Sequence, residues 1–246
     1  MPGELPEALT EAAAAVFADE LPRALRYAEL LATDGVERGL LGPREADRVW
    51  DRHVLNSAAV AGLVPSGAQV VDVGSGAGLP GIPLALARAD LAVVLLEPLL
   101  RRVTFLEEII AELRLAERVG VVRGRAPEDA AALPFRPDCV TARAVAPLER
   151  LLSWTMPLVR PDGELLALRG SSAAAEIEAA EPALARFAGG PAELLQVGGE
   201  LLPDPVTVVR VVRRRTDVPS PGRAARAVGR AAARTAGRRR NRPPRT

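Results

Sequence analysis

Runs of apolar residues alternate with amphipathic segments along most of the chain after residue 67. The apolar, β-branched runs predict strands, and the segments between them predict helices, at strand positions near 69–73, 91–97, 118–123, 138–142 and 164–168 and helix positions near 81–88, 99–114, 127–132, 147–158 and 173–187. Strands that alternate regularly with helices predict a mostly parallel, doubly wound α/β sheet with helices on both faces.

Two further apolar runs, 192–198 and 206–212, predict a different arrangement at the end of the sheet. The short connection between them, rich in glycine and proline, has no room for a helical crossover, so these two strands are expected to be antiparallel. Five parallel strands closed by such a hairpin are typical of the methyltransferase variant of the nucleotide-binding sheet. A dehydrogenase sheet normally adds its last strand in parallel.

Helical segments precede this sheet. Apolar residues recur at helical spacing over residues 5–32, and Pro22 predicts a break between two helices. Residues 33–48 are rich in glycine, proline and charge, which predicts a loop, and residues 49–64 predict another helix that enters the core.

The composition narrows the class of protein. The 246 residues are 48% hydrophobic and 26% charged, enough for one large domain with a sizeable core. No run approaches the ~20 apolar residues of a membrane span, and no secretory signal is visible. A single cysteine, Cys139, lies in an apolar run, which predicts a buried strand residue and excludes an internal disulfide or a multi-cysteine zinc site. We therefore expect a cytoplasmic protein that binds neither a membrane nor a metal.

Charge is distributed unevenly along the chain. All 32 basic residues are arginine, and twelve of them lie from Arg213 onward with a single acidic residue, a net charge of +11. The preceding 212 residues hold 20 arginines and 30 acidic residues, a net charge of −10. The last 31 residues contain few core-forming side chains, and we expect them to form a disordered tail suited to phosphate backbones.

The most informative motif follows the first predicted strand. Four glycines, Gly74, Gly76, Gly78 and Gly81, occur within eight residues, and an apolar helical segment follows. Glycines let a ligand approach the main chain, and the helix that follows presents free N–H groups. Glu97 ends the next apolar run, where an acidic residue can accept hydrogen bonds from ribose hydroxyls. Together these features predict a ligand that contains a nucleoside.

The glycine motif fits two different classes of nucleoside-containing ligand. The spacing Gly76-x-Gly78-x-x-Gly81 matches the dinucleotide fingerprint. The spacing Asp72-x-Gly74-x-Gly76-x-Gly78 instead matches the acidic residue and three glycines of S-adenosylmethionine enzymes, with Asp72 placed to order the loop and contact the methionine ammonium. Proline within a pyrophosphate turn removes an N–H donor, and this favours S-adenosylmethionine.

Several other residues are candidates for a functional role. Arg143 follows an apolar strand at the carboxyl edge of the sheet, where such folds bind ligands. His53 is the single histidine, and a packing or RNA-contacting role is favoured over proton transfer. Arg52, Arg101 and Arg102 are candidates for phosphate contacts, with solvated surface charge as the alternative. Phe105 and Trp154 are expected in the core.

Six stretches of the chain carry a resemblance to one known family: 51–57 (DRHVLNS), 71–84 (VDVGSGAGLPGIPL), 101–106 (RRVTFL), 124–126 (GRA), 142–148 (ARAVAPL) and 168–170 (LRG). Over roughly residues 25–213 the chain resembles the glucose-inhibited division protein B family, the small-subunit ribosomal RNA guanine-N7 methyltransferases. The extension of the glycine loop by Leu79-Pro80-Gly81-Ile82-Pro83-Leu84 is more specific than a general methyltransferase pattern.

The resemblance implies roles for individual residues. It implies that Gly74 and Leu79 of the loop contact the cofactor, that Ala126 and Pro127 flank the adenine, and that Arg143 lies beside the cofactor and the target base. We also expect Ser75, Gly76 and Gly78 of the same loop to contact the cofactor. The family usually has an acid where this chain has Pro127, so a carboxylate contact would move to Glu128. It commonly has lysine where this chain has Arg169, which we expect to contact RNA along with Arg52, His53 and Arg101.

The sequence therefore predicts a class I S-adenosylmethionine-dependent methyltransferase that acts on a guanine N7 of 16S ribosomal RNA. We expect an N-terminal helical segment over 1–64, a cofactor-binding core over 65–215 and the tail over 216–246. The expected partner is the small ribosomal subunit or its assembly intermediate, and the protein is expected to be a monomer. Two alternatives stay open: a nicotinamide-dependent oxidoreductase, and a non-catalytic RNA-binding or ribosome-assembly factor with the same fold.

Overall fold

The computed structural model describes residues 3–215. The predicted disorder of residues 216–246 lies outside this range. Residues up to Arg214 group into one compact unit, and its division into two parts at residue 64 stays a prediction. No helix among the described residues is both long and apolar enough to cross a membrane.

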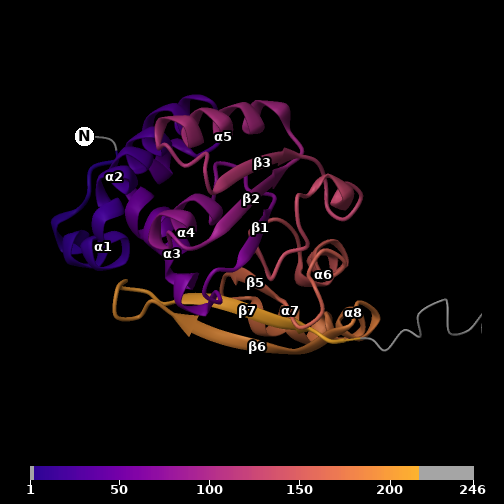
Figure 1. Cartoon of the computed structure of the whole chain (residues 1–246). Coiled ribbons are helices and arrows are strands. Elements are labelled where there is room, and N and C mark those ends of the chain that lie inside the picture. Colours follow the sequence, from indigo (N-terminus) through magenta and orange to yellow (C-terminus); the bar gives the residue numbers. More distant parts are fainter. Residues whose placement is uncertain (1–2, 216–246) are drawn as a thin grey trace, which may run out of the picture. The chain divides into compact units, whose positions relative to one another are not determined.

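Within the described residues seven strands form one sheet in the order β3-β2-β1-β4-β5-β7-β6 (Figure 1). The strands are β1 (Gln69–Val73), β2 (Ala92–Glu97), β3 (Val119–Arg123), β4 (Cys139–Arg143), β5 (Glu164–Arg169), β6 (Gly189–Val197) and β7 (Val206–Arg213). The first five are parallel, and β7 pairs antiparallel with both β5 and β6. The predicted strands and the closing hairpin are confirmed.

Helices cover both faces of the sheet, and neighbouring residues of each strand serve opposite faces. Val70 and Leu95 pack with the N-terminal helices, α4 (Gly81–Ala87) and α5 (Leu100–Glu112) in one hydrophobic core. Val71 and Leu96 pack in a second core with α6 (Leu148–Thr155), α7 (Ala173–Ala179) and α8 (Glu181–Arg186). The doubly wound arrangement is confirmed, and its central strands β1, β2, β4 and β5 are mostly apolar because both of their faces are buried. Cys139 is a fully buried strand residue, as expected.

The N-terminal region is helical but irregular. It contains α1 (Thr10–Phe17), α2 (Leu21–Leu30) and α3 (Leu55–Ala58), together with 3-10 helices at Glu7–Leu9, Ala18–Glu20, Pro43–Arg48 and Ala59–Leu63 and π-helical turns at Leu31–Gly35 and Val49–Val54. Pro22 lies in the first turn of α2, where its missing N–H has no helical partner to lose. The loop predicted over 33–48 is wrong in part, because it contains the turns at Leu31–Gly35 and Pro43–Arg48.

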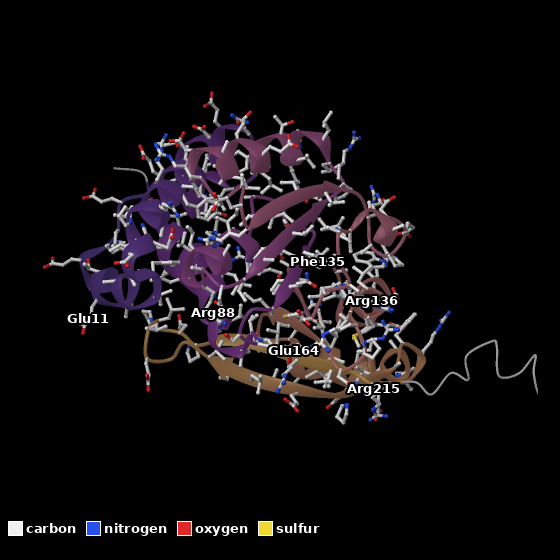
Figure 2. The ribbon with its side chains drawn as sticks, viewed as in Figure 1. Glu11, Arg88, Phe135, Arg136, Glu164 and Arg215 are labelled. Atoms are coloured by element: carbon white, nitrogen blue, oxygen red, sulfur yellow. The ribbon has the colours of Figure 1, made fainter. Side chains whose placement is uncertain are left out.

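Two other predicted helices differ from the structure. The segment predicted as a helix at 127–132 contains only a 3-10 turn at Ala130–Ala132. The rest of this connection packs as a loop: Phe135 contacts the second core, and Arg136 donates to the carbonyl of Pro157 at 3.1 Å (Figure 2). The helix predicted over 173–187 is two helices, because Pro182 in the first turn of α8 cannot continue the hydrogen bonding of α7.

Candidate active site

The carboxyl ends of β1, β2 and β4 open onto a cavity of about 620 Å³. In an open parallel sheet the crevice at this edge is the usual ligand site. Its wall includes most of the residues predicted to bind the cofactor: Gly74, Ser75, Gly76, Leu79, Glu97, Ala126 and Arg143. Residues that are far apart in the sequence therefore meet at one edge because the strands that carry them run parallel.

The glycines of the loop after β1 serve different purposes. Gly74, Gly76 and Gly78 all have positive φ, the conformation that side chains with a Cβ rarely adopt. A Cβ on Gly76 would have only the carbonyl oxygen of Gly74 near it, at 3.9 Å, so this position faces open space in the cavity. A Cβ on Gly78 would lie 2.6 Å from Ile82 and 3.1 Å from the Tyr27 hydroxyl. Close packing therefore requires glycine at position 78. Gly78 does not line the cavity, although it was expected to contact the cofactor directly.

Asp72 differs from its predicted role. Its side chain is fully buried below the loop and does not line the cavity. The carboxylate accepts hydrogen bonds from the Thr141 hydroxyl at 3.0 Å and from the Gly81 N–H at 3.2 Å. Burial raises the pKa of Asp72 to about 6. Asp72 thus ties the loop to β4, as expected, but its burial is incompatible with direct contact to a ligand ammonium in this conformation.

Glu97 joins the end of β2 to the glycine loop. One carboxylate oxygen accepts from the Gly76 N–H and the other from the Leu99 N–H, both at 3.0 Å. Arg102 lies 3.5 Å from the first oxygen and also lines the cavity. The side chain of Glu97 is 1% exposed, so its contact with the cavity is confined to a small part of the carboxylate. Each oxygen retains a second lone pair for a ligand hydroxyl.

The expected adenine site is only partly formed by the predicted residues. Ala126 lines the cavity and Pro127 does not, whereas the next residue, Glu128, does. Glu128 is therefore placed for the carboxylate contact that was expected to move to it from position 127. Trp154 of α6 packs against the second core, as expected, but is only half buried and also lines the cavity. Its spacing among apolar residues gave no signal that it would face a ligand site.

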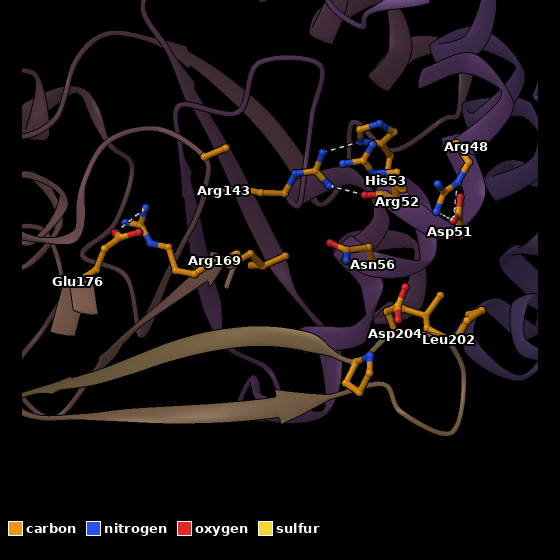
Figure 3. Close-up of a pocket in the computed structure, with 15 residues that line it drawn as sticks. Arg48, Asp51, Arg52, His53, Asn56, Arg143, Arg169, Glu176, Leu202 and Asp204 are labelled. Carbon is orange, nitrogen blue, oxygen red and sulfur yellow. Dashed lines mark hydrogen bonds and ion pairs between the residues drawn. The ribbon is translucent and has the colours of Figure 1, made fainter. Parts of the chain in front are cut away.

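A second cavity of about 560 Å³ adjoins the first (Figure 3). His53, Arg143 and Ala144 line both cavities and form the wall that they share. Arg52 and Arg169 line only the second cavity, together with Leu202, Pro203, Asp204 and Pro205 from the β6–β7 connection. Ala144 has a φ of 51°, an uncommon conformation outside glycine, which turns the chain directly after β4 at this wall.

Arg143 crosses from β4 to the N-terminal region. Its Nη1 donates to the carbonyl of Arg52 at 3.1 Å and to the Ser57 hydroxyl at 3.3 Å, and its Nη2 lies 2.5 Å from Nδ1 of His53. Burial lowers the pKa of Arg143, but a guanidinium keeps its proton at neutral pH. These contacts leave its Nε–H and one Nη2–H for a ligand, so Arg143 is a fixed donor at the shared wall (Figure 3).

His53 is neutral and has both ring nitrogens engaged. Nδ1 faces Arg143, and Nε2 lies 2.9 Å from a carboxylate oxygen of Glu45. Burial, and then the charge of Arg143, lowers the pKa of His53 to about 4 even though Glu45 opposes this shift. Glu45 was missed by the sequence reading, since nothing in its sequence surroundings links it to a residue eight positions later.

The remaining arginines separate into those at the cavities and one that is distant. Arg169 donates to the carbonyl of Ala146 at 2.7 Å, while its Nε and Nη2 are buried without a hydrogen-bond partner among the described residues. Arg52 is exposed and donates to Glu45 at 3.0 Å. Arg101 is exposed on α5 and lines neither cavity, so its predicted RNA contact is separated from this site. Its neighbour Arg102 faces the first cavity instead.

Comparison with known proteins agrees with this geometry. A family model, GidB, described as rRNA small subunit methyltransferase G, matches residues 20–195. The chain belongs to this family. It is 58% identical over 198 residues to ribosomal RNA small subunit methyltransferase G of Nocardioides sp. (80% of this chain, 78% of the relative). Against the protein of the same name from Salinispora tropica the identity is 51% over 228 residues (89% of this chain, 94% of the relative).

Solved structures support the fold of this member of the methyltransferase G family. The S-adenosylmethionine-dependent methyltransferase SibL in its apo form superposes with a TM-score of 0.55 at 20% identity, over 85% of this chain and 71% of SibL. Cofactor-bound Rv0187 from MTB superposes with a TM-score of 0.51 at 18% identity, over 87% of this chain and 100% of Rv0187. The fold is that of class I S-adenosylmethionine-dependent methyltransferases.

Proposed function

We propose that this protein transfers a methyl group from S-adenosylmethionine to N7 of a guanine in 16S ribosomal RNA. The observation that carries the proposal is the wall of His53, Arg143 and Ala144 shared by two cavities. One cavity has a glycine loop and a carboxylate, and the other has exposed arginine side chains. Such a pair of cavities can bring a methyl donor and an RNA base together. Membership in the methyltransferase G family supports this choice of donor and acceptor.

The residues of the larger cavity fit S-adenosylmethionine. The open space above Gly76 and the remaining lone pairs of Glu97 suit a ribose, and the cavity volume of about 620 Å³ suits a nucleoside-sized ligand. Ala126 and Glu128 are placed to flank the adenine. When bound, S-adenosylmethionine supplies a methyl group on a positively charged sulfonium. The chain's own contribution is to bind it, to orient it toward the shared wall and to exclude water.

The second cavity suits an RNA nucleotide. Arg48, Arg52 and Arg169 line it, and their charges are suited to RNA phosphates although the chain up to residue 212 is net acidic. Arg143 can use its two remaining N–H groups to orient the base from the shared wall. Holding two reactants in a near-attack geometry can lower a barrier by ~7–11 kcal/mol without any acid or base.

The contacts of His53 support direct displacement. Guanine N7 carries an in-plane lone pair and no proton at neutral pH, so it can attack the methyl carbon while the bond to sulfur breaks and the electron pair stays on sulfur. No side chain has to remove a proton. His53, with both nitrogens engaged and a pKa of about 4, is suited to holding Arg143 and not to general-base catalysis.

The test is methylation with labelled S-adenosylmethionine and 16S RNA, offered as naked RNA, as an assembly intermediate and as the small subunit, followed by mapping of the modified base. We expect label at a guanine N7, and loss of label with Arg143→Ala at unchanged RNA affinity. Cofactor that binds but is never transferred to any of the three RNA forms would favour the non-catalytic assembly factor. Label on another atom would overturn the assignment of N7.

We further infer that the partner is the small ribosomal subunit or its assembly intermediate and that the protein acts in the cytoplasm as a monomer. Membership in the methyltransferase G family supports the ribosomal partner and the location, and both cavities are built from a single chain. Light scattering of the purified protein should give the mass of one chain. A dimer at micromolar concentration would contradict this inference.

A further inference from the structure

Glu45 links two of the residues that surround the second cavity. It lies on the 3-10 helix Pro43–Arg48 and is only partly exposed. One of its carboxylate oxygens accepts from Nη1 of Arg52 at 3.0 Å, and the other lies 2.9 Å from Nε2 of His53. Glu45 lines neither cavity, so any effect on a ligand has to pass through these two partners.

The two neighbours of His53 determine where its proton lies. A guanidinium N–H can only donate, so Nδ1 must accept from Arg143 and carry no proton. A carboxylate can only accept, so Nε2 must carry the proton and donate it to Glu45. Neutral histidine has one proton on its ring, and both requirements are met by the same tautomer. In the other tautomer, two donors would face each other at the contact with Arg143, and two acceptors would face each other at the contact with Glu45.

The same contacts hold Arg143 at the wall between the cavities. Its Nη2 is fixed by Nδ1 of His53, and the unprotonated state of this nitrogen depends on the acceptor at Nε2. Without a carboxylate at position 45, water could accept from or donate to Nε2, and either tautomer could form. Arg143 would then lose its partner in part of the molecules.

We propose that Glu45 is a positioning residue for methyl transfer: it fixes the Nε2–H tautomer of His53, whose Nδ1 in turn holds the Arg143 guanidinium at the shared wall. The contact between Glu45 and His53 stands on the structure alone, whereas the effect on the reaction rests on the proposed function. Glu45 acts through His53 and contacts neither the cofactor nor the base.

The single histidine makes the tautomer directly measurable. In ¹⁵N-labelled protein without a histidine tag, long-range ¹H–¹⁵N spectra at neutral pH distinguish a protonated Nε2 from a protonated Nδ1. We expect the Nε2–H form in the parent protein and a mixture in Glu45→Ala. Glu45→Gln should restore the parent tautomer, because its side-chain carbonyl can accept from Nε2–H while the exposed Arg52 side chain turns away from the amide NH₂. Asp47→Asn is the matched control, since Asp47 is exposed on the same 3-10 helix and lines neither cavity.

The kinetic arm uses the same four proteins in single-turnover methylation at saturating RNA and cofactor. A displaced positioning group lowers rates by roughly 10- to 100-fold, and we expect a loss of this size in Glu45→Ala, with cofactor affinity unchanged. Glu45→Gln should regain most of the rate, and Asp47→Asn should match the parent.

Three results would overturn the proposal. They are an Nδ1–H tautomer in the parent, an unchanged tautomer in Glu45→Ala, and an altered tautomer with an unchanged rate. A purely structural role of Glu45 would lower the thermal unfolding temperature without moving the tautomer. If the parent itself methylates no RNA, the proposed function fails, while the spectra still decide whether Glu45 sets the tautomer of His53.

Discussion

At the scale of single residues, the partners of a side chain decide its chemistry. His53 and Asp72 are both buried near the site, and burial favours the neutral form of each: the pKa of His53 falls to about 4 and that of Asp72 rises to about 6. His53 lines both cavities but has both ring nitrogens engaged, whereas Asp72 lines neither cavity. His53 orients Arg143, and Asp72 holds the glycine loop to β4.

The depressed pKa of His53 predicts a loss of stability in acid. The unfolded chain takes up a proton at His53 as the pH falls below 6.5, whereas the folded protein does so only near pH 4. The unfolding free energy should therefore decrease as the pH falls between these values. At about 1.4 kcal/mol per pKa unit the upper limit from this group is roughly 3–4 kcal/mol, and solvent screening makes it smaller. Urea unfolding of the parent and of His53→Asn across this range measures the difference. Parallel pH profiles would contradict the prediction.

Glu97 gives a second prediction at this scale. Both of its oxygens accept backbone N–H groups, so Glu97→Gln must turn one amide NH₂ toward an N–H donor, and the conservative change should still be harmful. Calorimetry with S-adenosylmethionine should show affinity weakened by roughly 1–3 kcal/mol, the scale of a lost bond to a charged group. Glu107→Gln, at an exposed position of α5, is the control. Equal affinity of both variants would exclude Glu97 as an organiser of this site.

At the scale of elements, the N-terminal helices complete a site that the sheet alone does not form. α2 reaches the glycine loop through Tyr27, a fully buried residue whose hydroxyl donates to the carbonyl of Ala77 at 2.9 Å. The turn Val49–Val54 supplies His53 to the wall shared by the cavities. These contacts connect the helical segment to both ligand cavities.

Removing the Tyr27 hydroxyl should therefore affect both stability and cofactor binding. In Tyr27→Phe the buried carbonyl of Ala77 loses its partner, which costs about 1–3 kcal/mol of unfolding free energy. Because this carbonyl belongs to the loop, cofactor affinity should fall severalfold as well. Thr155→Val removes a buried hydroxyl bond of 2.8 Å within α6 and is the control. It should lose stability alone, and a cofactor defect of equal size in both variants would indicate a general effect of destabilisation.

At the scale of the whole molecule, charge predicts how RNA is held. The chain from residue 213 onward carries +11, and the preceding residues carry −10. Phosphate contacts provide affinity that weakens with salt but carry no base specificity, whereas the choice of base belongs to the cavities. We therefore predict that affinity and base choice fall to different parts of the chain.

Deletion of residues 217–246, which removes nine arginines, should weaken RNA binding at low salt and flatten its salt dependence. The methylated position and the affinity for S-adenosylmethionine should not change. A full-length variant with these nine arginines replaced by glutamine should behave in the same way, which separates charge from length. RNA affinity that is unchanged across a salt titration would show that the tail contributes nothing to binding.

The sequence by itself determined the sheet, its closing hairpin and the position of the glycine loop. These follow from local patterns: alternating apolar runs, a connection too short for a helix, and glycines at fixed spacing followed by Glu97 at the end of the next apolar run. The hydrophobic burial of strands and the geometry of turns act over a few residues, so they can be read along the chain. For the same reason the break between α1 and α2, close to Pro22, was predicted, while the break before Pro182 and the short turn at Ala130–Ala132 were not.

Only the tertiary structure decided which residues face the cavities. It buried Asp72, directed Gly78 into the packing around Tyr27, and placed Arg102 at the cofactor cavity and Arg101 at neither cavity. It placed Trp154 at the cavity wall as well as against the second core. It also joined Glu45, His53 and Arg143, which come from three separate segments. The direction of a side chain and the partner of a buried charge depend on packing between distant segments. No pattern along the chain records such a contact, because its energy arises only when the segments meet.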